Sequence, residues 1–284
     1  MKRIAAVAIS LGLAGAACAG SLSEVRKRVE ASLLVTGTID IAADGSVRSY
    51  TLDKQDKLPP VVVDLVHKAA ATWRFKPVDG SPADVIAKMN LRVVAKPVGD
   101  DNFAISISGA NFGENTPGEQ PSVDRRKQPT YPASAVASRV SGTVYVLVRI
   151  DHSGHVADAS VEQVNLTVVD TDIQMKKWRK VLGDASLDAA RDWTFHIPTT
   201  GKHVDDAFWV ARVPVSYTIN GGAPRSRDGG WTAYVPGPRQ MAPWSNQHGD
   251  ASQDQGAADA LPDDSIALVG TGPVLTTPLQ PSGS

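Results

Sequence analysis

The 284-residue sequence has one cysteine, Cys18, and no surplus of charge of either sign. A single cysteine cannot form an intramolecular disulfide, and it excludes a zinc site built from several cysteines. Lys and Arg number 29 against 30 Asp and Glu, and the net charge of -1 argues against a protein that wraps nucleic acid. Aromatic residues make up only 6% of the chain, so any that recur in a pattern are informative.

The sequence also lacks the common motifs of enzymes. It contains no Gly-x-Ser-x-Gly elbow, no phosphate-binding loop and no Gly-x-Gly-x-x-Gly motif after a strand. A Ser-His-Asp triad can be assembled from residues that are distant in the sequence, so a hydrolase of this kind stays an open alternative, although no residue points to one. His152 and His155 flank a turn, but neither a Glu nor a third ligand lies beside them. We therefore expect no enzymatic activity, no cofactor and no metal site.

The N-terminal residues are typical of a secretory signal peptide. Two basic residues precede an apolar run from Ile4 to Ala17, which is shorter than the roughly 20 residues needed to span a bilayer. Ala17-Cys18-Ala19 then has the small residues of a cleavage site, so we expect residues 1–19 to be removed. Lipidation of Cys18 is the alternative, because the residues before it loosely resemble a lipobox. No other run is apolar enough for a membrane helix, and we expect an exported protein without an integral membrane span.

The C-terminal residues 221–284 are rich in Gly and Pro and contain neither Lys nor Glu. They show no sustained hydrophobic periodicity, and such a composition is typical of segments that cannot bury enough apolar surface to fold. The sequence therefore predicts a disordered tail. Trp231, Tyr234 and Trp244 within it are either scattered aromatics, which we favour, or points of contact with a partner.

Between these ends the chain carries two copies of one pattern. Both share a Val-x-Gly-x-apolar start, a turn glycine and a Trp-x-Phe motif that ends a short helix. These features are residues 35–39, Gly45 and Trp73-Arg74-Phe75 in the first copy, and residues 140–144, Gly154 and Trp193-Thr194-Phe195 in the second. A repeat of this size predicts two units of the same fold. Because large aromatics are few, we favour a structural role for the Trp and Phe of each motif over ligand stacking.

Hydrophobic periodicity predicts the order strand, strand, helix, strand in each unit, with a hairpin around the turn glycine. The first helix is expected after Pro60 and the second after a cap at Asp184 or Ser186. Residues 85–94 and 208–219 are expected as closing strands. We therefore predict an α+β fold of two small units, each an antiparallel three-stranded sheet with a packed helix, plus the disordered tail. The basic residues around Trp178 are interpreted as a solvated helical face with the indole on the domain.

The second copy resembles the C-terminal domain of the TonB energy-transducer family. The resemblance rests on the Gln128-to-Ala133 lead, the Arg139-Val140-Ser141-Gly142 start, the helix that ends at Trp193, and the Val213-to-Tyr217 strand. It is clear over residues 128–220 and weaker in the first copy. The expected division is a signal peptide at 1–19, a divergent TonB-like domain at 30–108, a linker at 109–127, a TonB C-terminal-like domain at 128–220 and the tail at 221–284.

The resemblance implies a periplasmic function. TonB C-terminal domains bind a short segment of outer-membrane receptors for siderophores and similar cargo, the TonB box, by adding it as a strand to the edge of their last strand. Eight residues of this chain would then contact the receptor segment: Gln128, Pro129, Tyr131, Phe208, Val210, Arg212, Pro214 and Ser216. Pro214 has no N–H group, which suits an edge strand.

The chain departs from a complete TonB, because a second TonB-like unit stands where the membrane anchor and the Pro-rich spacer would be. We therefore expect a periplasmic protein that binds TonB-dependent outer-membrane receptors or other envelope proteins, linked to energy-dependent transport. The first alternative is a structural or adaptor envelope protein whose units hide their edges. Dimerisation through the same edge is the second. All three depend on whether the edge of the last strand is free.

Overall fold

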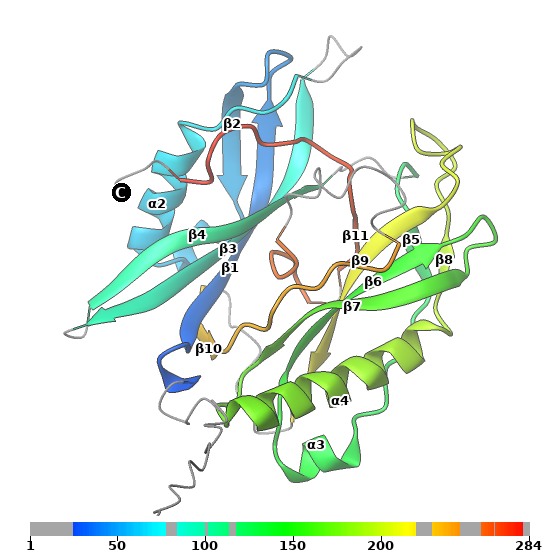
Figure 1. The fold of residues 1–284 in the computed structure, drawn as a ribbon. Coiled ribbons are helices and arrows are strands. Elements are labelled where there is room, and N and C mark those ends of the chain that lie inside the picture. The colour runs from blue at the N-terminus through cyan, green and yellow to red at the C-terminus, as the bar shows by residue number, and fades with distance from the viewer. Residues whose placement is uncertain are drawn as a thin grey trace, which may run out of the picture.

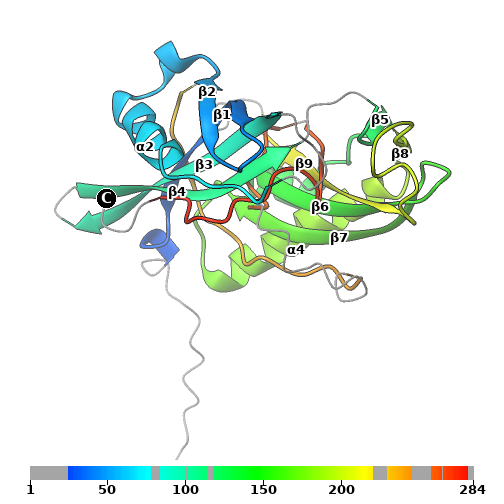
Figure 2. The same ribbon diagram turned by 90° about the horizontal axis from the view of Figure 1, so that it is seen from above.

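The computed structural model describes residues 25–77, 84–99, 102–113, 118–219, 229–244, 257–263 and 265–280. The expected signal peptide and Cys18 lie outside these residues. The chain forms two antiparallel sheets, and each carries its helix on the face turned away from the other sheet (Figure 1). The C-terminal segment threads between the sheets, as the two perpendicular views show (Figure 2). The predicted α+β class is confirmed.

The first unit is built on the long strand β1 (Glu30–Ile41). β1 pairs antiparallel with β2 (Val47–Leu52) and β3 (Val85–Gly99), and β3 pairs in turn with β4 (Asn102–Gly113). After the short 3-10 helix η1 (Gln55–Lys57), α2 (Pro60–Ala70) begins behind Pro59 as predicted. Its buried residues are Val62, Val66, Ala69 and Ala70. The sheet is wider than the three predicted strands, because β4 adds a strand that extends into the expected linker.

The second unit has the predicted three strands at its centre. β6 (Gly142–Ile150) lies between β7 (Val156–Leu166) and β9 (Trp209–Tyr217). The helices α3 (Ala133–Ala137) and α4 (Asp172–Ala190) contribute buried residues to the core on the outer face of this sheet. Two short strands, β5 (Ser122–Arg125) and β8 (Thr194–His196), pair with each other in a small separate sheet.

The helix α4 begins at Asp172 and not at the predicted cap, Asp184 or Ser186. The Thr171 side chain caps it by accepting a hydrogen bond from the Gln174 amide at 3.4 Å. Its core-facing residues recur every three or four positions: Met175, Trp178, Leu182, Ser186 and Ala189. The segment that lengthens the second copy is therefore an extension of the helix. Trp178 is 6% exposed and lies in the core, as expected.

Both units fix their Trp-x-Phe motif to the turn glycine by the same contact. The amide of Phe75 donates to the carbonyl of Gly45, and the amide of Phe195 donates to the carbonyl of Gly154, each at 2.8 Å. The two glycines have φ of +83° and +78°, a conformation that disfavours other residues. In the second turn, hydrogen bonds from Ser153 hold the pKa of Asp151 below its usual range. The hairpin and the end of the helix are thus joined through one backbone contact in each unit.

The C-terminal segment is ordered over its described residues, which corrects the prediction of a disordered tail. β10 (Thr232–Tyr234) pairs with β1, and β11 (Ala267–Leu268) pairs with β9. Buried residues of the segment include Tyr234, Val235, Trp244, Leu261, Leu268 and Leu275. Its aromatics are therefore not scattered, since Trp231 also packs against the first core. Over its described residues the segment packs its apolar side chains onto the two units, with Leu268 and Leu275 in their cores and Trp244 in a small cluster with Leu147.

The close approach of Gly154 to Phe195 can be tested against another glycine of positive φ. A Cβ at Gly154 would lie 2.2 Å from the Phe195 carbonyl oxygen, whereas a Cβ at Gly270 (φ +79°) would meet nothing within 4 Å. We expect Gly270→Ala to lower the free energy of unfolding by about 1 kcal/mol through the strained φ alone. Gly154→Ala adds a backbone clash and should lower it by more than ~2 kcal/mol in urea unfolding. Equal losses would contradict the importance of the contact.

Candidate functional site

The sequence points to the outer edge of the last strand, which is β9. β6 occupies the other side of β9 along its whole length. Backbone N–H and C=O groups alternate in direction along a strand, and the Val210 carbonyl faces outward because it accepts a hydrogen bond from Val269 at 2.8 Å. The same alternation turns the backbone groups of Arg212, Pro214 and Ser216 outward. These four residues form the edge at which an extended segment can pair.

β11 occupies the first half of this edge. Ala267 and Leu268 are in antiparallel register with Arg212 and Ala211, and Val269 continues the pairing at Val210. The Leu268 side chain is 7% exposed and joins the core of the second unit. The pairing covers only these few residues. The edge of β9 therefore holds a short extended segment, which is the chain's own.

The second half of the edge carries no strand. Among the described residues, no strand pairs with the outer edge of β9 beyond Arg212. Pro214 offers only its carbonyl, which accepts a hydrogen bond from the Arg126 guanidinium. The same guanidinium lies 5.4 Å from the centroid of the Trp193 ring. Ser216 is exposed at the far end, with its hydroxyl 3.4 Å from that of Thr143.

The predicted lead segment lies near the end of β9, and its residues differ in exposure and in contacts. Gln128 is exposed and Pro129 is half-buried. Tyr131 donates a hydrogen bond to the carbonyl of Val140, and its ring meets the Tyr217 ring edge-on at 5.1 Å. Burial raises the pKa of Tyr217 to about 12. Tyr131 therefore holds the lead segment against the end of β9, while Gln128 is free to meet a partner.

The predicted site side chains of β9 point away from the edge. Arg212 is fully buried, and its Nε and Nη2 donate to the Glu162 carboxylate at 2.5 and 2.9 Å. Arg239 of the C-terminal segment donates to the same carboxylate at 2.8 Å. Val210 packs against the cluster that contains Trp244, and the ring of Phe208, just before β9, lies 5.4 Å from the Arg149 guanidinium. A partner at this edge would meet these β9 residues through their backbone. No motif in the sequence pairs Glu162 with two distant arginines.

The C-terminal segment covers the second half of the opposite edge of this sheet, at residues 162–166 of β7. Val235 and Leu166 exchange backbone hydrogen bonds of 2.7 and 3.2 Å, and the Gln240 amide donates to the Glu162 carbonyl at 2.7 Å. Arg179 of α4 donates to backbone carbonyls of both β7 and the segment. Desolvation lowers the pKa of this guanidinium. The C-terminal segment thus contacts both edges of this sheet, each over part of its length.

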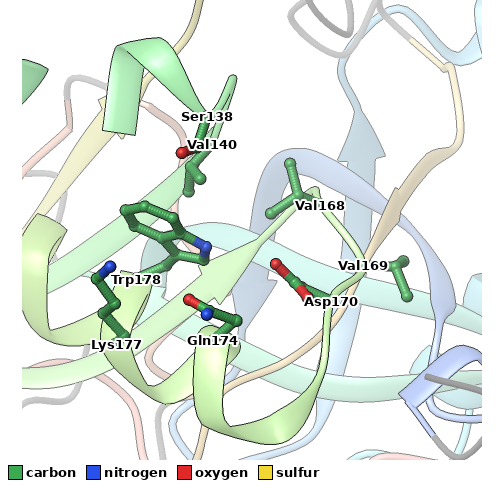
Figure 3. A pocket seen from close by; sticks show the side chains of 8 residues that line it. All are labelled: Ser138, Val140, Val168, Val169, Asp170, Gln174, Lys177 and Trp178. Atoms are coloured by element: carbon green, nitrogen blue, oxygen red, sulfur yellow. The ribbon is translucent and has the colours of Figure 1, made fainter. Parts of the chain in front are cut away.

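Two cavities lie near α4 and β9. The first, of about 460 Å³, lies at the start of α4, with the Trp178 ring between the side chains of Val140 and Lys177 (Figure 3). The second, of about 490 Å³, lies between the two sheets, and its wall includes Ser216 and Thr218 at the end of β9. Its other lining groups are mostly hydroxyls, with Arg92 and Asp263 as the charged ones. The open half of the β9 edge thus borders a cavity with both polar and apolar walls.

The described residues hold no group of three or more His, Cys, Asp or Glu side chains that could bind a metal ion. At the hairpin turn, His152 packs edge-on against Trp209 at 5.0 Å and His155 lies 3.0 Å from the Ser153 hydroxyl. Within the same residues, the structure contains no helix with the length and apolar character needed to cross a membrane.

The geometry defines a small α+β module whose last strand accepts an extended segment at its edge. The chain is 32% identical over 92 residues to Protein TonB of Xanthomonas campestris pv. campestris, in strains B100 and ATCC 33913. The match covers 32% of this chain and 35% of each relative, so the chain spans about a third of their length. No family model and no solved structure matches the chain. The similarity supports a TonB-like domain in this protein.

The buried carboxylate of Glu162 should be important for stability. Glu162→Ala removes the carboxylate that faces the buried Arg212, and we expect the free energy of unfolding to fall by ~3–5 kcal/mol. Asp184→Ala removes only an exposed ion pair with Lys180 and should cost less than ~1 kcal/mol. Urea unfolding of both variants measures the difference. A loss in Glu162→Ala as small as that of the surface variant would contradict this account.

Proposed function

We propose that this is a periplasmic TonB-like protein that binds extended segments of outer-membrane receptors by strand addition at β9. Its place would be in a system that drives transport across the outer membrane. One observation carries the proposal: the outer edge of β9 already holds an extended antiparallel segment, β11. The similarity to Protein TonB supports an outer-membrane receptor as the partner.

A receptor segment would use the backbone groups that β11 uses. In strand addition, main-chain hydrogen bonds supply affinity, and pockets for alternate side chains supply selectivity. A segment in the register of β11 would donate to the Val210 carbonyl and pair with Arg212. Pro214 then breaks the ladder, because it has no N–H and its carbonyl is taken by Arg126. Beyond it, Ser216 and the cavity of about 490 Å³ would receive the end of the segment.

β11 competes with any such segment. It belongs to the same chain, so its effective concentration at β9 is high and a free peptide has to displace it. Only two residues of β11 are in register with β9, so few hydrogen bonds oppose the exchange. We infer that β11 keeps the edge paired until a receptor segment of higher affinity replaces it. Dimerisation through this edge would require the same displacement. Neither step needs a catalytic group, and we propose a binding protein and not an enzyme.

We further propose that the first unit is a diverged copy of the same domain. The equal contacts of Gly45 with Phe75 and of Gly154 with Phe195 support this relation. A structural envelope protein is the second candidate function. It is favoured by the extent to which the C-terminal segment covers the strand edges of β1, β7 and β9.

Weakening β11 should strengthen receptor binding. Val269→Pro removes the amide that donates to Val210, whereas Val269→Thr keeps that amide and the side-chain shape. We expect Val269→Pro to bind TonB-box peptides about fivefold more tightly, the equivalent of one lost hydrogen bond in the competitor. Val269→Thr should bind like the unchanged chain. Titration of the isotope-labelled full chain, followed by backbone amide shifts, gives both affinities and the residues that respond.

The location of the shifts distinguishes the two candidate functions. Saturable shifts at residues 209–217 support strand addition. Equal affinity of the two variants, or shifts confined to other strands, would contradict binding at this edge. Absence of binding at millimolar peptide in both variants would favour the structural function.

A further inference from the structure

Residues 272–280 of the C-terminal segment lie against the first Trp-x-Phe motif. The surface of the first unit that they cover, formed by Trp73, Phe75 and Ile107, is called the groove. Two main-chain hydrogen bonds of 2.8 Å join them: the Lys76 amide donates to Val274, and the Thr276 amide donates to Arg74. Between these two bonds, Phe75 and Leu275 form an antiparallel bridge. The segment is therefore bound to the motif as an added strand, although about two hundred residues separate them in the sequence.

Two leucines anchor this strand. Leu275 is 8% exposed and lies in the first core, against which Leu279 also packs. The indole N–H of Trp73 donates to the Leu279 carbonyl at 3.0 Å, and the Ile107 amide donates to the Gln280 side chain at 3.0 Å. The groove therefore recognises both the backbone and the apolar side chains of the segment. Two of the segment's residues, Thr276 and Pro278, are exposed to solvent.

The second unit fills the equivalent groove with a different part of the chain. The indole N–H of Trp193 donates to the Lys127 carbonyl at 2.8 Å, and Phe195 pairs with Val123 of β5. That occupant directly precedes the second unit in the sequence, whereas the occupant of the first groove comes from the C-terminal end. The shared feature is an extended strand whose backbone carbonyl accepts from the indole. The groove thus fits an extended segment without requiring one particular connection.

We propose that the groove of the first unit is a second peptide-binding site, distinct from the β9 edge. Its ligand is an extended segment with leucine-like side chains four residues apart. Residues 272–280 are the tethered ligand, and an extended segment of the same pattern from another chain competes for the groove. Phe112 forms one wall, because its ring stands edge-on to Trp73 at 5.5 Å and to Phe75 at 4.9 Å.

Occupation of this groove is linked to the state of β9 through the chain itself. β11 ends at Leu268, and only a short turn separates it from the bound segment that begins at Gly272. Residues 272–280 therefore hold one end of β11 in place. A competing peptide in the first groove would loosen β11. Only this effect on β11 rests on the function proposed for β9; the peptide-binding site itself does not.

The full chain with a protease site introduced at Gly270-Thr271 tests the proposal. A side chain at Gly270 would meet nothing within 4 Å, so the site is open to modification and to cleavage after folding. We expect the cleaved C-terminal fragment to exchange with a fluorescent peptide of residues 272–280, in a saturable 1:1 reaction followed by anisotropy. Leu275→Asp in the peptide should weaken binding by ~100-fold or more, because it would bury a carboxylate in the core.

Two matched variants of the cleaved chain locate the binding site. Trp73→Phe and Trp193→Phe each remove one indole N–H from an equivalent buried position. Loss of one hydrogen bond should lower the peptide affinity about fivefold in Trp73→Phe and leave it unchanged in Trp193→Phe. An equal change in both variants would overturn the assignment to the first groove.

Thermal unfolding of the cleaved chain completes the test. Retention of a cooperative transition after the fragment has been exchanged supports a ligand in a groove. Failure of the peptide to displace the fragment, or unfolding of the chain once the fragment leaves, would show that residues 272–280 belong to the fold and would overturn the proposal. Receptor peptides are absent from this experiment, so its failure leaves the function proposed for β9 to be judged separately.

Discussion

The pairing of open strand edges is the constraint on which the rest of this structure depends. Outer N–H and C=O groups of an edge strand need partners, and an unprotected edge recruits other chains. The C-terminal segment supplies strands or extended residues at four edges: β1, β7, β9 and the first Trp-x-Phe motif. A Gly- and Pro-rich chain suits this role, since it stays extended, turns sharply and builds no core of its own.

The β9 edge is covered over only part of its length. Along β7, the Val235 pair and the Gln240 bond combine with Arg179 of α4, so several groups hold the covering segment. On β9 the covering strand stops at Arg212, and Pro214 cannot donate to a further strand. Such partial cover protects the edge against indiscriminate pairing and suits the reversible peptide binding proposed for it.

Local patterns made much of the fold predictable, and distant contacts account for what was missed. Gly45 and Gly154 mark tight hairpins because few other residues adopt their φ, and Val62 and Val66 reveal the buried face of α2. The start of α4 was missed because basic residues surround Trp178 and obscure the spacing of its buried face. The tail was misjudged for a different reason. Leu268 and Leu275 are isolated in the sequence, and only the folded units show where they are buried, so neither the ordered tail nor the occupied β9 edge could be predicted.

The proposed function requires that β11 and a receptor segment bind to the same edge of β9. Ala211 and Leu268 are direct partners in the β9–β11 pair, at a position where side chains approach closely enough for a disulfide. The most direct measurement is binding of a TonB-box peptide to the full chain with Ala211→Cys and Leu268→Cys in a Cys18→Ser background, before and after reduction. We predict no binding while the disulfide locks β11 in place, and saturable binding once it is reduced. Binding that is equal in both states, or absent from both, would contradict the account.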